Sequence, residues 1–352
     1  MTEGLIWGPI LIGGIVAALS PFVVKPILTR AGIFDVPNER SSHIRPTLRG
    51  CGIAQLLGII ITIIGLLMVF GWGVDSRVLI SVSIGAVVAS ITGLIDDVRG
   101  ANGLNTPLRL FIQVLVGTWV AIFAALIFPQ PWWAIVIGLV FIAGYINVVN
   151  FMDGINGISG LHGLVVGISY AVIGSLTDHE WLLAIGLMIA VVFVVFLPWN
   201  FTPSGAFLGD VGSYLLGALI SGAAVAAVFG GILWIAMIGP LAIYLSDTGV
   251  TIVRRLFQGK NIFSGHREHV YQRLISQGLH HSVASLIVTA FSIATGTLGI
   301  LCLVRVMNMW VCIVMIILIC GGYMLLPNIY HYTDAVQSVQ NRTRVWKCRM
   351  LH

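Results

Sequence analysis

Apolar residues along this chain fall into long runs that short polar segments separate. Each run is close to the ~20 residues that a helix needs to cross a bilayer, and a helix satisfies its own backbone hydrogen bonds where water is absent. The pattern predicts an all-α fold, a polytopic integral membrane bundle of about eleven transmembrane helices. The expected spans lie near residues 5–24, 52–70, 78–95, 109–128, 132–149, 158–176, 181–198, 213–230, 232–250, 282–304 and 309–328.

The stretch 213–250 is broken only by Gly230, Gly231 and Pro240. We divide it into two spans, because the orientation of the chain on either side of it requires an even number of crossings. The first run has no basic residue before it and is long for the core of a signal peptide, so we expect it to be retained as a span.

Basic residues predict the orientation of the bundle. If the amino terminus lies outside, 16 of the 18 lysine and arginine residues fall in inner loops or in the carboxyl-terminal tail, and only Arg77 and Arg305 fall outside. The positive-inside rule therefore favours an external amino terminus and an internal carboxyl terminus. We expect residues 1–330 to form one transmembrane catalytic domain with cytoplasmic active-site loops, followed by a short basic cytoplasmic tail, 331–352.

Composition agrees with a membrane protein and excludes a water-soluble one. Hydrophobic residues make up 58% of the chain and charged residues 9%, and the mean hydropathy is +1.02. The net charge of +5 resides in loops between spans, so it does not indicate nucleic-acid binding. The five cysteines lack the spacing of a metal site, and we expect no disulfide framework.

Three aspartate-bearing segments interrupt the apolar pattern at regular intervals. Asp96 and Asp97 end one span, and Asp153 and Asp210 follow at 56 and 57 positions after Asp97 and Asp153. Each interval accommodates two spans, which return the chain to the same side. The acids could thus gather around a metal ion and an anionic substrate. The alternative is that helix ends are polar simply because water begins there.

Amides accompany the second of these segments. Asn147, Asn150, Asp153 and Asn156 recur every three residues, which places them on one face of a helix. Four polar groups on one stripe suggest a ligand site, whereas single asparagines more often bond between membrane helices. The glycines of the third segment, Gly209-Asp210-Val211-Gly212-Ser213, would let the backbone approach a phosphate.

Two loops could supply cations for that site. His266, Arg267 and His269 suit a diphosphate opposite a magnesium ion. The alternative is an ordinary positive-inside loop, which explains arginines but not two histidines spaced by three. The first inner loop, with His43 and Thr47, could bind a lipid phosphate or anchor the chain to anionic headgroups.

One further acid lies inside a predicted span. Asp247 is interpreted either as the buried partner of a nearby arginine or as part of a polar cavity. Ionisable residues within membrane spans are costly and are usually functional.

These motifs, taken in order, resemble those of the polyprenyl-phosphate N-acetylhexosamine-1-phosphate transferases, of the glycosyltransferase family 4 type. The resemblance rests on Asp96-Asp97, 147–157, 207–213 and 266–274. Within the family the chain is similar to the branch that starts O-antigen and other surface-polysaccharide synthesis. The peptidoglycan-precursor branch has three consecutive histidines where this chain has His266-Arg267-Glu268-His269. Some relatives have a second aspartate where this chain has Asn156.

The resemblance implies transfer of a sugar 1-phosphate from a UDP-N-acetylhexosamine, such as UDP-GlcNAc, to undecaprenyl phosphate, with release of UMP. It implies a bacterial inner membrane protein with a cytoplasmic active site, and Mg2+ as cofactor with Mn2+ as a substitute. Membrane lipids are the remaining partner. By the same resemblance we expect catalytic roles for Asp96, Asp97, Asp153 and Asn156, metal binding by Asp210 with Asp97 or Asp96, and substrate binding by Asn147, Asn150, His266, Arg267, His269, His43 and Thr47.

The resemblance also suggests an aspartate as general base. A phosphate monoester with a second pKa of ~6 is already mostly dianionic at neutral pH, however. We therefore expect a nearby carboxylate to orient the acceptor or to hold metal.

Other interpretations stay open. A peptidoglycan-precursor phosphotransferase is the first alternative, and a secondary transporter, which the buried Asp247 would suit, is the second. Transporters place coupling residues near the bilayer midplane, often within inverted repeats, whereas the acids here lie at span ends and no repeat is visible. Small residues along 217–224 could pack within one bundle or between two copies in a homodimer.

Overall fold

The computed structural model describes residues 3–35, 46–100, 103–201, 205–261 and 266–349, with side chains up to residue 330. Within these ranges eleven helical segments are long and apolar enough to cross a membrane. The predicted helix bundle with eleven spans is therefore confirmed, and so is the division of 213–250 into two spans.

The spans begin and end close to the predicted positions. They are Gly4–Arg30, made of α1 (Glu3–Leu19) and α2 (Pro21–Arg30); α3 (Ile53–Phe70); α4 (Val74–Arg99); α5 (Thr106–Ile127); α6 (Trp132–Met152); α7 (Ile158–Leu176); Glu180–Phe201, with α8 (Glu180–Val194) and α9 (Leu197–Phe201); α10 (Gly209–Phe229); Trp234–Phe257; α14 (His281–Leu303); and the first part of α15 (Met309–Arg349). A short helix, α13 (Val270–Ser276), lies between the ninth and tenth spans.

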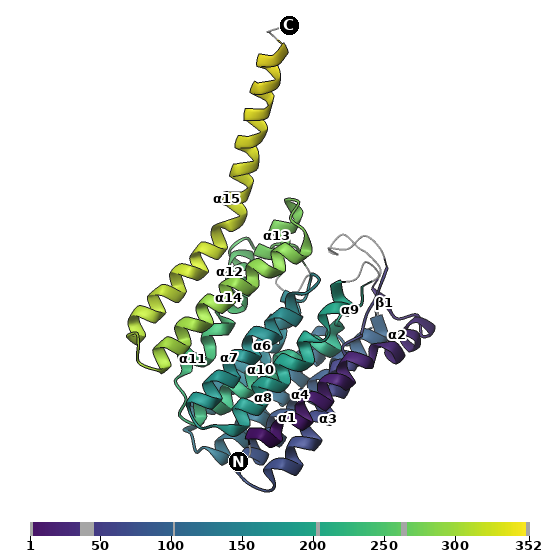
Figure 1. Cartoon of the computed structure of the whole chain (residues 1–352), viewed down its shortest axis with the longest axis vertical. Coiled ribbons are helices and arrows are strands. Elements are labelled where there is room, and N and C mark those ends of the chain that lie inside the picture. The colour runs from purple at the N-terminus through teal and green to yellow at the C-terminus, as the bar shows by residue number, and fades with distance from the viewer. Residues whose placement is uncertain (1–2, 36–45, 101–102, 202–204, 262–265, 350–352) are drawn as a thin grey trace.

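The ninth span is broken into three pieces, α11 (Trp234–Ile238), the 3-10 turn Gly239–Leu241 and α12 (Ala242–Phe257). Pro240 has no backbone N–H to donate and its ring crowds the preceding turn, so a regular helix cannot continue through it. The break turns α12 toward α13, and the two helices meet at one end of the bundle (Figure 1).

Helix α10 forms the centre of the bundle, and nearly all of its residues are buried. Its small residues pack against neighbouring helices of the same chain: a methyl group at Gly217 would lie 2.8 Å from the backbone of Ile146, and one at Gly222 would lie 3.2 Å from Val82. Packing within one bundle therefore accounts for the small-residue face along 217–224.

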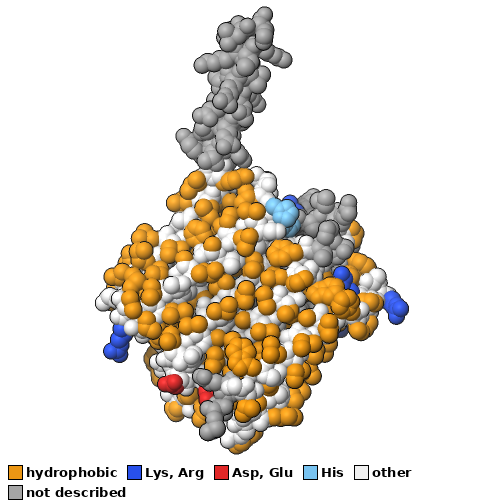
Figure 2. Space-filling view, in the orientation of Figure 1, with side chains coloured by type: hydrophobic (Ala, Val, Ile, Leu, Met, Phe, Trp, Pro, Cys, Tyr) orange, Lys and Arg blue, Asp and Glu red, His pale blue; other side chains and the backbone are white. Residues whose placement is uncertain are grey.

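Apolar side chains cover the outer face of the bundle, as Figure 2 shows. Met68, Trp72 and Leu126 expose 81%, 85% and 71% of their surface. A surface of this kind is unfavourable in water but matches the hydrocarbon core of a bilayer. The chain is thus a multi-pass membrane protein.

A two-stranded hairpin is the one departure from the all-helical prediction in the described ranges. β1 (Phe34–Asp35) pairs antiparallel with β2 (Thr47–Leu48), and Leu48 also bridges Ala206. Phe207 donates its amide to the Leu48 carbonyl at 2.8 Å, and Cys51 donates to the Phe207 carbonyl at 3.1 Å. These bonds lay the end of the first loop along the entrance to α10.

Candidate active site

The carboxylate of Asp97 caps the amino terminus of α10. Its Oδ1 accepts the amide of Asp210 and its Oδ2 accepts the amide of Val211, both at 3.0 Å. The first amides of a helix lack partners within the helix and carry partial positive charge, so a carboxylate is favourable there. Asp97 on α4 therefore fixes the start of α10, where Asp210 lies.

Two glycines allow this close approach of α4 and α10. A side chain at Gly93 would overlap the backbone of Asp210, and one at Gly209 would overlap the Asp97 carboxylate. Gly209 also has φ +75°, a conformation that glycine adopts without strain. Contact between helices thus accounts for these glycines, including the one expected to approach a phosphate.

Arg49 joins Asp97 to Asp210. Its Nε lies 2.6 Å from Asp97 Oδ1, and its Nη2 lies 2.8 Å from Asp210 Oδ2. Burial alone would lower the pKa of the Arg49 guanidinium, but the carboxylates of Asp210 and Asp97, with Asp35 in addition, outweigh burial and the pKa is raised. Asn150 donates to Asp210 Oδ1 at 2.8 Å and to Ser213 Oγ at 3.1 Å. The Asp210 side chain is thereby held in one orientation.

A polar cavity of about 230 Å³ opens beside this cluster. Two carboxylates and two guanidiniums lie on its wall, together with a short glycine-containing turn; the lining residues are Arg49, Asp96, Gly100, Gly103, Leu104, Arg109 and Asp210. Asp96 Oδ1 accepts the Leu104 amide at 2.6 Å. Asp96 Oδ2 lies 3.5 Å from Arg109 Nη1 and is buried without a hydrogen-bond partner. The cavity therefore contains a carboxylate oxygen that accepts no hydrogen bond and is held only by the ion pair with Arg109.

This donor set fits Mg2+ better than a metal that needs a full protein cage. Among the described residues no three His, Cys, Asp or Glu side chains are grouped as metal ligands. Mg2+ commonly takes one or two carboxylates and completes its shell with water and substrate phosphates. Asp96 Oδ2, which accepts no hydrogen bond, and the Asp210 carboxylate lie on one cavity wall and suit that pattern. Both oxygens of Asp97 already accept backbone amides.

Asp153 lies in the turn between α6 and α7, a few residues after Asn150. Ser159 donates its hydroxyl to Asp153 Oδ1 at 2.6 Å. Burial, together with the nearby Asp210 charge, raises the pKa of Asp153 to about 7, although the Ser159 hydrogen bond and Arg49 oppose the shift. The protonation of Asp153 therefore changes near neutral pH.

The turn that carries Asp153 is held on several sides. Tyr271 donates to the Phe151 carbonyl at 3.0 Å, and its ring lies where a side chain at Gly154 would be. Gly157 has φ +86°, and its amide donates to Asn200 Oδ1. The Asn156 carbonyl accepts the Ser285 hydroxyl at 2.8 Å. The geometry around Asp153 is thus supported by other helices.

The predicted stripe of amides divides into two environments. Asn150 faces Asp210, as described above. Asn147 donates to Gln113 Oε1 at 2.6 Å and to the Ala143 carbonyl at 2.8 Å, so its contacts join α5 and α6. These contacts are those of the interhelical alternative, and the substrate-binding role of Asn147 stays a prediction.

The two histidines of the segment 266–269, here called the histidine loop, differ in burial and in hydrogen bonding. His269 is buried, and its Nδ1 lies 3.1 Å from Asp247 Oδ1. His266 is half-buried, its Nδ1 is without a hydrogen-bond partner, and burial together with the neighbouring cations lowers its pKa to about 4. His266 is therefore neutral at pH 7. Arg267 between them is exposed.

Asp247 has partners that neither sequence interpretation named. Besides His269, it accepts the Val270 amide at 3.1 Å and the Tyr323 hydroxyl at 2.9 Å. Arg255 instead binds Glu268 Oε1 at 2.6 Å. The buried acid is thus paired with the histidine loop.

The remaining predicted residues belong to the first inner loop. Thr47 lies in β2, where it pairs with Asp35. His43 lies outside the described residues. Arg49 and Ser159 were not predicted as site residues. The only sequence signal for Arg49 was its place in the basic, hydroxyl-rich first loop, and the only one for Ser159 was its position six residues after Asp153.

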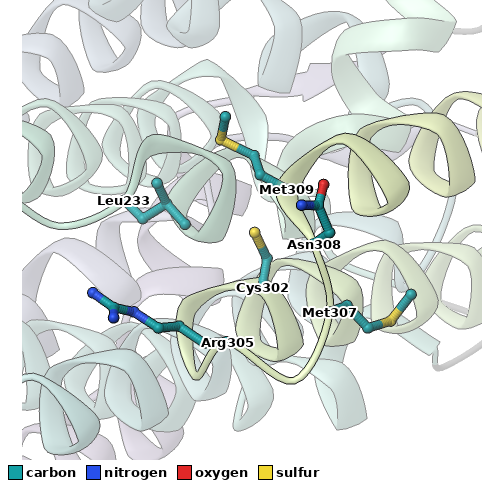
Figure 3. Close-up of a pocket in the computed structure, with 6 residues that line it drawn as sticks. All are labelled: Leu233, Cys302, Arg305, Met307, Asn308 and Met309. Carbon is teal, nitrogen blue, oxygen red and sulfur yellow. The ribbon is translucent and has the colours of Figure 1, made fainter.

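A second cavity, of about 440 Å³, lies at the turn between α14 and α15 (Figure 3). It is lined by Leu233, Cys302, Arg305, Met307, Asn308 and Met309. Figure 1 places this turn at the end of the bundle away from α13. The lining of this second cavity contains no carboxylate, whereas the 230 Å³ cavity is lined by Asp96 and Asp210.

Comparison with known proteins places this architecture in a family. Residues 79–228 match the family described as glycosyl transferase family 4. The probable undecaprenyl-phosphate N-acetylglucosaminyl 1-phosphate transferase of Bacillus subtilis is 24% identical over 298 residues, 79% of this chain and 81% of the relative. The decaprenyl-phosphate N-acetylglucosaminephosphotransferase of Mycobacterium tuberculosis is 27% identical over 323 residues, 79% of this chain and 78% of the relative.

A third relative is more similar over a shorter range. The undecaprenyl-phosphate alpha-N-acetylglucosaminyl 1-phosphate transferase of Thermotoga maritima is 31% identical over 221 residues, 60% of this chain and 66% of the relative. The family match covers the segments that contain Asp96, Asp97, Asp153 and Asp210. The chain belongs to glycosyl transferase family 4.

Proposed function

We propose that this protein transfers the sugar 1-phosphate of a UDP-N-acetylhexosamine to undecaprenyl phosphate and releases UMP. The observation that carries the proposal is the polar cavity in which Asp96 and Asp210 lie beside Arg49 and Arg109, at one end of an apolar membrane bundle. A diphosphate and a phosphate monoester bring several negative charges together, and such a cavity can neutralise them. Three relatives named as polyprenyl-phosphate N-acetylglucosamine-1-phosphate transferases support the same reaction.

The reaction exchanges one phosphoanhydride for another. An oxygen of the acceptor phosphate attacks the β-phosphorus of the donor, the bond from that phosphorus to the oxygen bridging the two phosphates breaks, and UMP leaves with the electron pair. Catalysis of such a step depends mainly on positioning and on charge stabilisation. Mg2+ held by Asp96 and Asp210 would neutralise charge on the diphosphate when it is bound.

The chain's own residues account for the positioning. Asp97 fixes the amino terminus of α10, so that Asp210 and the guanidinium of Arg49 keep their places on the cavity wall. Asn150 orients Asp210 from α6. Asp153 is proposed to orient the acceptor phosphate, because that phosphate is already mostly dianionic near pH 7 and needs no base.

The donor is proposed to bind between the cavity and the histidine loop. His266 has an unpaired Nδ1, and Arg267 is exposed. Neutral imidazole and a guanidinium are suitable donors for phosphate or nucleotide oxygens. Asn156, on the turn beside Asp153, is proposed to contribute an amide to the same region.

We further propose that the protein acts in a bacterial inner membrane, with this end of the bundle in the cytoplasm, and that it starts a surface polysaccharide. The distribution of Lys and Arg supports the orientation. The sequence His266-Arg267-Glu268-His269, in place of three consecutive histidines, supports the surface-polysaccharide branch over the peptidoglycan branch.

The test uses purified protein in detergent with undecaprenyl phosphate, Mg2+ and a panel of UDP-N-acetylhexosamines. We expect Mg2+-dependent release of UMP by the wild type and none by Asp210→Asn. Asp75→Asn is the matched control, because Asp75 lies at the opposite end of α4 and accepts the Trp181 amide at 3.2 Å; it should remain active. Turnover only with a peptide-bearing donor of the peptidoglycan pathway would favour the alternative branch, and no UMP release with any donor would contradict the proposal.

A further inference from the structure

Asp247 is a fully buried carboxylate within the ninth span, and the proposed reaction does not use it directly. It is 0% exposed. An unpaired charge in such a place would be strongly unfavourable. The protein instead surrounds the carboxylate with hydrogen-bond donors from the histidine loop, α13 and α15. These contacts offset the unfavourable free energy of burying the charge.

Those contacts converge on the start of α13. The Val270 amide lies 3.1 Å from both carboxylate oxygens, and His269 Nδ1 lies 3.1 Å from Oδ1. Tyr323 on α15 donates to Oδ2 at 2.9 Å, and Thr251, one turn along α12, is 3.5 Å from Oδ1. One carboxylate therefore ties α12, α13 and α15 together at the residue where the histidine loop ends.

The hydrogen bond to Asp247 also determines which nitrogen of His269 carries a proton. A carboxylate oxygen accepts, so Nδ1 is the nitrogen that donates to Asp247. The ring is further restrained between Tyr271, whose ring centroid is 5.9 Å away with an interplanar angle of 13°, and Phe151 at 6.5 Å. These contacts thus restrict the orientation of the His269 side chain.

His269 in turn supports the exposed part of the loop. The ring of His266 lies 4.9 Å from that of His269, centroid to centroid. Glu268 is held separately by Arg255 at 2.6 Å and Lys260 at 3.1 Å. The segment 266–269 therefore has two anchors on one face of α12, at Asp247 and at Arg255.

We propose that Asp247 is a positioning residue for donor binding: by fixing His269 and the first turn of α13, it holds His266 and Arg267 in the arrangement that the UDP-sugar requires. This inference rests on the proposed function. Asp247 itself touches no substrate in this arrangement. Asp247 affects donor binding through His269. An experiment that combines substitutions at both residues can therefore distinguish this role from a purely structural one.

The experiment measures the dissociation constant of UDP-GlcNAc by titration calorimetry, without acceptor, for four proteins: wild type, Asp247→Asn, His269→Ala and the double variant. Asparagine keeps one oxygen for the Val270 amide but turns an NH2 donor toward His269 or Tyr323. We expect each single variant to bind donor about 10- to 100-fold more weakly, the range for loss of a charge-assisted bond that orients a ligand group. The double variant should bind no more weakly than His269→Ala.

A role in stability alone predicts a different pattern. The melting temperature of Asp247→Asn would then fall while the folded protein bound donor as the wild type does, and that result would overturn the inference. The inference would also be overturned if Asp247→Asn weakened donor binding by the same factor in the His269→Ala variant as in the wild type. In turnover assays we expect the KM for donor to rise while kcat at saturating donor stays within about threefold.

Tyr323→Phe provides a milder variant should Asp247→Asn fail to fold. It removes one neutral donor to Asp247 and should weaken donor binding about two- to tenfold, so unchanged donor affinity in Tyr323→Phe would overturn the inference. Asp75→Asn is the control and should bind donor normally. If the wild type neither binds UDP-GlcNAc nor releases UMP from any donor, the proposed function fails, and this inference fails with it; if the wild type does both and the variants match it, only the inference fails.

Discussion

Replacing Asp153 by asparagine should make the protein more stable at pH 8 although it impairs turnover. In the folded protein the pKa of Asp153 is raised to about 7, because the carboxylate is buried and lies near Asp210. In an unfolded chain the same group has a pKa of about 3.9. Folding at pH 8 therefore places a negative charge where the protein disfavours it, and asparagine removes that charge while keeping an oxygen to accept the Ser159 hydroxyl.

The magnitude follows from the difference between the two pKa values. A difference of about three units, at about 1.4 kcal/mol per unit, gives an upper limit on the order of 4 kcal/mol. Asparagine does not pack identically, so we expect a gain in the free energy of unfolding of about 2–4 kcal/mol at pH 8. Gains of this kind at functional positions reflect the strain that an active site retains.

The pH dependence has a definite sign. Below about pH 4 the carboxyl is protonated in both states, so wild type and Asp153→Asn should differ little. As the pH rises from about 4 to 7, the unfolded state ionises while the folded state still holds its proton, and the wild type loses stability relative to the variant. Above pH 7 the difference should be constant.

The assay is thermal unfolding of the detergent-solubilised protein at one scan rate, at pH 4.5, 6 and 8, followed by tryptophan fluorescence. We expect the melting temperature of Asp153→Asn to exceed that of the wild type by several degrees at pH 8 and by progressively less toward pH 4.5. Asp75→Asn should show no such gain. A variant that is less stable at pH 8, or a difference that does not change with pH, would refute the reasoning.

Two other substitutions should behave in contrasting ways. Asp97→Asn should lower the free energy of unfolding by about 3–5 kcal/mol, because the carboxylate accepts two amides of α10 and binds Arg49. The residual turnover of this variant should have a pH profile of the same shape as the wild type. A changed shape would instead support a general-base role for Asp97. Asp96→Asn should alter stability by less than about 1 kcal/mol, because Oδ2 accepts no hydrogen bond and its ion pair with the partly exposed Arg109 is long, at 3.5 Å. It should nevertheless raise the Mg2+ concentration for half-maximal activity about tenfold or more, and an unchanged Mg2+ requirement would remove Asp96 from the proposed metal site.

The spans were predictable because the bilayer imposes both a length and a composition on them. Runs of about 20 apolar residues gave all eleven, and the break at Gly230-Gly231 was correctly interpreted as a boundary. The shared location of the acids followed from counting two spans between successive motifs. The hairpin of β1 and β2 was missed, because two-residue strands leave no periodic signal.

Partners within the site were harder to predict. Arg49 reaches Asp97 and Asp210 only because Leu48 and Cys51 pair with the backbone of Phe207, a contact across more than 150 residues that no local pattern encodes. Asp247 was expected to pair with a nearby arginine or to line a cavity. The change of direction at Pro240 instead places Asp247 of α12 beside His269. Arg255, two helical turns later, forms an ion pair with Glu268.

In the proposed reaction, the β-phosphate moves together with the sugar. We would incubate the purified protein with Mg2+, undecaprenyl phosphate and UDP-GlcNAc, or whichever donor of the panel is used, carrying radioactive phosphorus at the β-phosphate. We expect the label to appear in the organic-soluble lipid and unlabelled UMP to be released, with neither product from Asp210→Asn. Label that stays with the nucleotide as UDP while the sugar reaches the lipid would contradict the account.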